Sequence, residues 1–172
     1  MDETWRTATW QQFGAAIDML GNALRDCPDE LWAESLWDDR DAPGLSAFWY
    51  LAYHALFWLD LYLSGTREGF APPDPFTLDE LDPAGVLPPK AYTRAELEGY
   101  LAHGRRKCRE TIETLTGDRA SRPCRVGTGE MPFAELLLYN MRHVQEHAAQ
   151  LSMLLGQRAG TAFRWERRSD DT

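Results

Sequence analysis

Apolar residues recur along the chain at three- and four-residue steps, and this spacing predicts long helices. The first covers residues 5–25 and carries one apolar stripe. The members of that stripe are Trp10, Phe13, Gly14, Ile17, Leu20 and Leu24. Residues 45–63 are apolar nearly all round, so we expect protein to surround this second helix on most sides. Ser64 and Gly65 should end it.

Start and stop signals mark a third and a fourth helix. Thr93 and Glu96 form a capping-box pattern ahead of an amphipathic stretch that ends at Gly117. Pro132, a favoured first-turn residue, opens a helix that ends near Gly156. The apolar positions of these two helices are Leu97, Leu101, Cys108, Ile112 and Leu115, then Phe133, Leu137, Val144, Ala148, Leu151 and Leu155.

The connections between these helices lack a regular period. Residues 66–92 hold six of the ten prolines and predict a long irregular crossover between helices two and three. A crossover of about 27 residues can run back along the molecule, so these two helices can point the same way. A second loop passes through residues 125–127. Because no alternating strand pattern longer than a few residues appears, the predicted fold class is all-α, a four-helix bundle.

The chain length of 172 residues suits one core, so we expect one domain, a helical bundle at residues 1–158. Residues 159–172 form a mostly polar C-terminal tail that should fray. Phe163 and Trp165 are the tail side chains able to attach it to the bundle. Three tail arginines can meet a substrate carboxylate, although a solvated tail is the preferred interpretation: Arg164, Arg167 and Arg168.

Composition and charge exclude several classes of protein. With 44% hydrophobic and 26% charged residues the chain is typical of a soluble globular protein. A formal net charge of −9 argues against nucleic acid as a partner, because nucleic-acid binders carry a basic surface. The first residues lack the basic start and apolar run of a signal peptide. The segment 48–63 is too short and too polar to span a bilayer, so we expect no membrane contact.

The three cysteines are widely spaced and form no CxxC pair: Cys27, Cys108 and Cys124. We therefore expect packed, reduced thiols and a cytoplasmic location.

The candidate chemistry comes from three histidines. His143 and His147 are four residues apart, so their side chains share one face of the fourth helix. His54 lies mid-way along the apolar second helix, where an unpaired polar ring would be unfavourable. The simpler explanation for a histidine at this buried position is a hydrogen bond from its ring to a carboxylate or a backbone carbonyl. The alternative is a shared metal ion.

The depth of the three histidines favours the metal. His54 lies about 14 Å from either end of its helix, and His143 and His147 lie roughly 15–20 Å from the ends of theirs. All three therefore share one layer of the bundle. Three neutral imidazoles suit zinc, nickel, iron or copper, and they leave a position open for water or substrate. Such a site can generate a nucleophile near neutral pH.

Other polar residues near this layer are weaker candidates. Glu146 is rotated off the histidine face and is interpreted as a surface acid, while Gln150 lies closer to it; either can support a ligand from outside. Asn140 and Tyr139 either border the pocket or make core contacts. His103 lies on a charged face of the third helix and is interpreted as a boundary residue.

These motifs resemble those of the DinB-like superfamily of metal-binding helical bundles, which includes bacillithiol and mycothiol S-transferases and metal-dependent hydrolases. His54 in YHALFWLDLYL is similar to the second-helix ligand of that family, and His143 and His147 in RHVQEHAAQL are similar to its HxxxH pair. The resemblance covers the chain up to about Gly156. It implies an up-down-down-up bundle, a site open at one end and frequent homodimers.

Three functions remain open at this point. The first is a metal-dependent enzyme, a thiol S-transferase or a hydrolase, that acts on a small-molecule substrate with water or a thiolate as nucleophile. Its cofactors would be zinc, nickel or iron and, for the transferase, a low-molecular-weight thiol. The second is a non-catalytic metal-binding or dimerising bundle, for which the aromatic second helix would suit a dimer interface. A third, a metal-free carrier with an aromatic pocket, would show ligand-dependent stabilisation in chelator.

Overall fold

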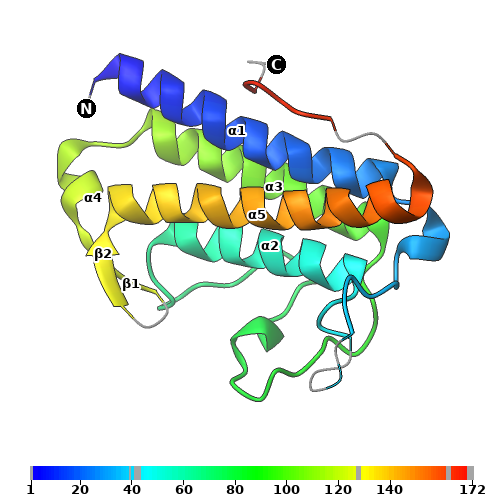
Figure 1. Cartoon of the computed structure of the whole chain (residues 1–172). Helices are drawn as coiled ribbons and strands as arrows, with labels where there is room; N and C mark the ends of the chain where they lie inside the picture. Colours follow the sequence, from blue (N-terminus) through cyan, green and yellow to red (C-terminus); the bar gives the residue numbers. More distant parts are fainter. Residues whose placement is uncertain (1, 39, 41–43, 127–128, 162–163, 170–172) are drawn as a thin grey trace.

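A computed structural model describes residues 2–38, 40, 44–126, 129–161 and 164–169 of the chain (Figure 1). Long helices make up most of it. They are α1 (Glu3–Asp26), α2 (Phe48–Ser64), α3 (Arg94–Glu113) and α5 (Phe133–Ala159). The short elements are the 3₁₀ turns η1 (Asp29–Leu31) and η2 (Asp79–Leu81), helix α4 (Gly117–Ser121) and strands β1 (Pro123–Val126) and β2 (Gly129–Pro132). The all-α prediction is thus confirmed in its broad form, with a small two-stranded sheet added.

Each long helix packs against two others. α1 contacts α3 and α5, and α2 contacts the same two helices from the other side. In Figure 1, α1 and α5 run from left to right, whereas α2 and α3 run in the opposite direction. The crossover at residues 66–92 therefore joins two helices that point the same way, and it passes below α2 in that view.

The local signals in the sequence set most helix ends. The Thr93 hydroxyl and the Glu96 side chain form the predicted capping box at the start of α3. Gly65 ends α2 with φ of 72°, a left-handed conformation that glycine adopts without a steric penalty. The predicted end of the fourth helix near Gly156 was wrong. α5 continues to Ala159 because the left-handed C-cap is Gly160, with φ of 66°.

The loop predicted between the third and fourth helices contains regular structure. α4 follows α3 after a short turn, and β1 pairs with β2 in an antiparallel hairpin. Each strand has four residues, which is too short for an alternating pattern to stand out in the sequence. Cys124 and Val126 are buried, so the hairpin closes this end of the molecule.

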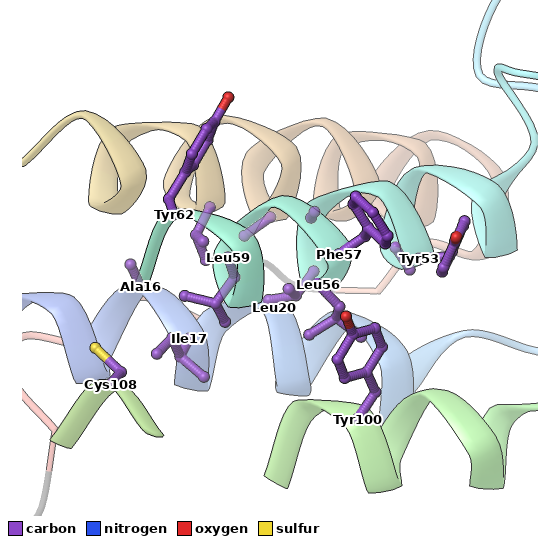
Figure 2. Close-up of a cluster of buried hydrophobic side chains, with 14 of the residues drawn as sticks. Ala16, Ile17, Leu20, Tyr53, Leu56, Phe57, Leu59, Tyr62, Tyr100 and Cys108 are labelled. Atoms are coloured by element: carbon purple, nitrogen blue, oxygen red, sulfur yellow. The ribbon is translucent and has the colours of Figure 1, made fainter. Parts of the chain in front are cut away.

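The core lies between the long helices, and α2 supplies much of it (Figure 2). Nearly all side chains of α2 are buried, as its uniform apolar pattern predicts. Figure 2 shows the contributions of three helices: Ala16, Ile17 and Leu20 from α1, Tyr53, Leu56, Phe57, Leu59 and Tyr62 from α2, and Tyr100 and Cys108 from α3. Most aromatic side chains of α2 are thus buried within the chain, while the dimer interface suggested for this helix stays a prediction.

A charged cluster is embedded in this core between α2 and α3. The Asp60 side chain is only 1% exposed and accepts a hydrogen bond of 2.5 Å from Lys107 Nζ. The Tyr100 hydroxyl donates to its other oxygen at 3.1 Å. Lys107 also donates to the Ser64 hydroxyl at 2.7 Å. Asp60 is therefore a buried carboxylate whose charge is balanced by one lysine and several hydrogen-bond donors.

The tail does not fray where the structure describes it. Arg164 forms a 2.7 Å ion pair with Asp26, and Glu166 accepts a hydrogen bond from Asn22 at 2.8 Å, both at α1. Ser169 is buried and its amide donates to the Gln11 carbonyl at 2.9 Å. These polar contacts with α1 hold the segment in place. Contacts of this kind leave no periodic pattern in the sequence, so the sequence did not predict them. Trp165 is 64% exposed, and Phe163 lies outside the described residues.

Two further expectations concern membranes and thiols. Among the described residues, no helix has the length and apolarity that crossing a bilayer demands. Each of the three cysteines is buried and free of a disulfide.

Candidate metal centre

The three predicted histidines meet between α2 and α5. His54 reaches the site from α2, while His143 and His147 reach it from successive turns of α5. His143 Nε2 lies 3.2 Å from His54 Nε2 and 3.2 Å from His147 Nε2. One ring nitrogen from each of the three residues falls within 4.8 Å of the other two. Three nitrogen atoms thus surround one point between the helices.

The outer nitrogens of two of these rings have acceptors. His54 Nδ1 is hydrogen-bonded to Glu80 Oε1, and His147 Nδ1 to Gln150 Oε1 at 2.8 Å. Carboxylate and amide oxygens only accept, so in the neutral rings Nδ1 carries the proton and Nε2 presents a lone pair. The lone pairs of His54 and His147 therefore point at the shared centre. This donor set fits a divalent metal ion.

His143 lies deepest in the site. Burial, together with the neighbouring His147 and His54, lowers its pKa to about 3. Burial and His54 also lower the pKa of His147. The Nδ1 atom of His143 is buried without a hydrogen-bond partner among the described residues. Neutral rings are the form that binds a metal, so the environment prepares these residues as ligands.

Glu80 is the site residue that the sequence did not reveal. It lies in η2 on the crossover, and its side chain is 5% exposed. Trp58 Nε1 donates to its Oε1 at 2.9 Å and the Tyr50 hydroxyl to its Oε2 at 2.8 Å. Burial alone would raise the pKa of Glu80, but hydrogen bonds from His54, Trp58 and Tyr50 outweigh burial and lower it. The sequence signals were the length of the crossover and the carboxylate or carbonyl partner suggested for His54, neither of which identifies Glu80 itself.

The weaker candidates divide into three groups. Of the two residues suggested as outer partners of a ligand, Gln150 is hydrogen-bonded to His147. Glu146 is exposed, in line with its interpretation as a surface acid. Asn140 is buried and donates to the Leu59 carbonyl at 3.0 Å, and Tyr139 stands edge-on to Tyr62. His103 lies 3.4 Å from Asp60, outside the three-histidine group, as expected for a boundary residue.

Aromatic rings flank the histidines on α2. The Trp58 ring lies 6.2 Å from that of His54, and the Tyr62 ring lies 6.0 Å from that of His143. The Arg67 guanidinium lies over Trp58 at 5.7 Å. The His54 side chain nevertheless keeps 27% of its surface exposed, so the centre is accessible from solvent on this side.

Metal-free protein should lose stability as the pH falls below 6.5. His143 takes up a proton near 6.5 when unfolded but only near 3 when folded, so below 6.5 the unfolded chain binds more protons. Thermal melts in chelator between about pH 8 and pH 5 should show a falling melting temperature. Glu80, with its lowered pKa, would add to the loss only at lower pH, below 4.5. His143→Gln should flatten the curve; an unchanged slope would assign the proton uptake to other groups.

Comparison with protein-family models gives a match. A family model described as the DinB superfamily matches residues 12–151, a stretch that includes the three histidines of the site and Glu80. No curated protein sequence and no solved structure matches the chain.

Proposed function

This chain belongs to the DinB superfamily, and from that premise we propose that it is an enzyme dependent on a divalent metal ion held by His54, His143 and His147. One observation carries the proposal. His143 Nε2 lies 3.2 Å from the Nε2 atoms of both His54 and His147. The Nδ1 atoms of His54 and His147 are hydrogen-bonded to acceptors, so the lone pairs on their Nε2 atoms point into the site. Three histidines without cysteine ligands are typical of catalytic rather than structural zinc sites.

The proposed metal is zinc, nickel or iron, because imidazole nitrogen suits each of them. When bound, such an ion lowers the pKa of a coordinated water or thiol and so supplies a nucleophile near neutral pH. We therefore propose thiol S-transfer with a low-molecular-weight thiol, or hydrolysis, on a small-molecule substrate. The exposed edge of His54 supports access for either reactant.

The protein side chains have separate tasks in this proposal. Glu80 and Gln150 orient His54 and His147, so the ligand geometry exists before the metal binds. Burial keeps His143 neutral, so a metal does not have to displace a proton from it at neutral pH. Trp58 and Tyr62 form an apolar boundary that limits water around the nucleophile.

The proposal extends to the assembly. It includes the up-down-down-up bundle of the family over residues 1–158, which the helix directions in Figure 1 support, with residues 159–172 as the tail. It includes a cytoplasmic location, supported by three free thiols. It also includes a homodimer, supported by the exposed Leu138 and Met153 on α5, which are 47% and 58% exposed.

Metal analysis of untagged protein tests the function. We expect about one transition-metal ion per chain, as a single three-histidine site implies. Screens with thiol acceptors, esters and amides should reveal an activity that a chelator abolishes and the same metal restores. Activity that persists without metal would refute the enzyme proposal. Bound metal without activity, whose removal only lowers the melting temperature, would favour the non-catalytic bundle.

A further inference from the structure

We propose that Glu80 is a positioning residue, which holds the His54 ring in the tautomer and orientation that let its Nε2 bind the metal. The inference rests on the proposed function, because it assigns the metal to the three histidines. It goes further by making a segment of the crossover part of the site. The acceptor belongs to η2, 26 residues along the chain from the histidine that it contacts.

The contacts of Glu80 all go to one face of α2. Tyr50, His54 and Trp58 are spaced by four residues, so they stand above one another on the helix. Each donates to the same carboxylate: the Tyr50 hydroxyl to Oε2 at 2.8 Å, and His54 Nδ1 and Trp58 Nε1 to Oε1, the latter at 2.9 Å. Three donors from three successive turns fix both carboxylate oxygens.

Packing alone does not explain this arrangement. Burying a carboxylate to 5% exposure is unfavourable, and an apolar residue in the crossover would cover α2 without that desolvation. What the carboxylate adds is a charged acceptor at His54 Nδ1. It keeps the proton on that nitrogen and makes Nε2 a stronger electron donor.

His147 provides an internal comparison. Its Nδ1 partner is Gln150, a neutral amide three residues further along the same helix. That contact is local and would form wherever α5 is helical. The His54 contact instead requires the crossover to be seated on α2. The position of η2 and the orientation of one metal ligand are therefore coupled.

Nitrogen-15 NMR of metal-free protein tests the positioning directly, because the two neutral tautomers of histidine give different ring-nitrogen shifts. In the wild type we expect His54 as the Nδ1–H tautomer. Glu80→Ala should convert it to a mixture, whereas Glu80→Gln, which keeps an acceptor oxygen, should restore the wild-type pattern. Gln150→Ala is the matched control and should leave His54 unchanged. Far-UV circular dichroism identifies variants that have not folded.

Zinc titration against a competing chelator gives the second readout. Glu80→Ala should weaken zinc binding by roughly 10–100-fold, the usual effect of losing an outer partner of a ligand, and Glu80→Gln by less. An unchanged tautomer and an affinity within about twofold of wild type would overturn the inference and leave Glu80 as a packing residue. A tautomer that changes in Glu80→Ala, combined with a wild-type protein that binds no zinc, would confirm the positioning while refuting the proposed function.

Discussion

Replacing His143 with alanine should abolish metal binding and leave a folded helical protein. His143 Nε2 lies 3.2 Å from the Nε2 atoms of both His54 and His147, so its loss leaves two nitrogens without their common neighbour. The loss of affinity should exceed the roughly 10–100-fold effect of removing an outer partner. The variant should also remain stable, because it removes a buried polar Nδ1 that has no partner among the described residues.

Metal content by plasma mass spectrometry and zinc titration measure this effect. His103→Ala is the matched control, since it removes a histidine of the same protein that lies beside Asp60 rather than in the three-histidine group. We expect the His103 variant to keep its metal. Retention of metal by the His143 variant would show that the ion, if present, binds elsewhere.

Replacing Lys107 with methionine should destabilise the protein by about 3–5 kcal/mol, as expected when one partner of a buried ion pair is removed. Methionine keeps the unbranched apolar stem of the lysine side chain but lacks its charged terminal nitrogen. The Asp60 carboxylate, 1% exposed, would lose its 2.5 Å partner and, among the described residues, retain the Tyr100 hydroxyl and His103 as close partners. For a chain of this size the melting temperature should fall by roughly 6–20 °C.

An exposed ion pair provides the contrast for this prediction. Arg125 and Glu130 lie 2.6 Å apart on the hairpin with 85% and 48% of their side chains exposed. Arg125→Ala should change stability by only about 0–1 kcal/mol, because water screens the pair. Adding Asp60→Asn to Lys107→Met should recover part of the lost stability by removing the buried charge. Equal losses of stability in the Lys107 and Arg125 variants would mean that the Asp60 charge is adequately balanced without the lysine.

The long helices and the group of three histidines were predictable because each depends on local spacing. A 3.6-residue period marks the buried face of a helix, and a separation of four places His143 and His147 side by side. The position of His54 mid-way along an apolar helix placed it at the same depth. The metal itself remains a prediction, since the geometry is compatible with an ion but does not identify one.

The rest depended on contacts between segments far apart in the chain. Glu80 sits in a crossover without any period, and only the folded chain places it against α2. The tail follows α1 through single polar contacts such as Arg164 with Asp26. Neither contact leaves a pattern in the residues around it. The hairpin strands are likewise too short to show an alternation.

Because η2 is attached to α2, the parts of the crossover differ in how well they tolerate changes of sequence and length. Residues 82–86 are exposed and belong to no helix or strand, so insertions there would disturb little, as would substitutions other than at Gly85, whose φ of 65° favours glycine. Asp79–Leu81 cannot drift in the same way, because moving Glu80 by one position would withdraw its carboxylate from His54. An engineer who shortens this crossover, or grafts a recognition loop onto it, should therefore cut after Asp82 and keep the preceding turn intact.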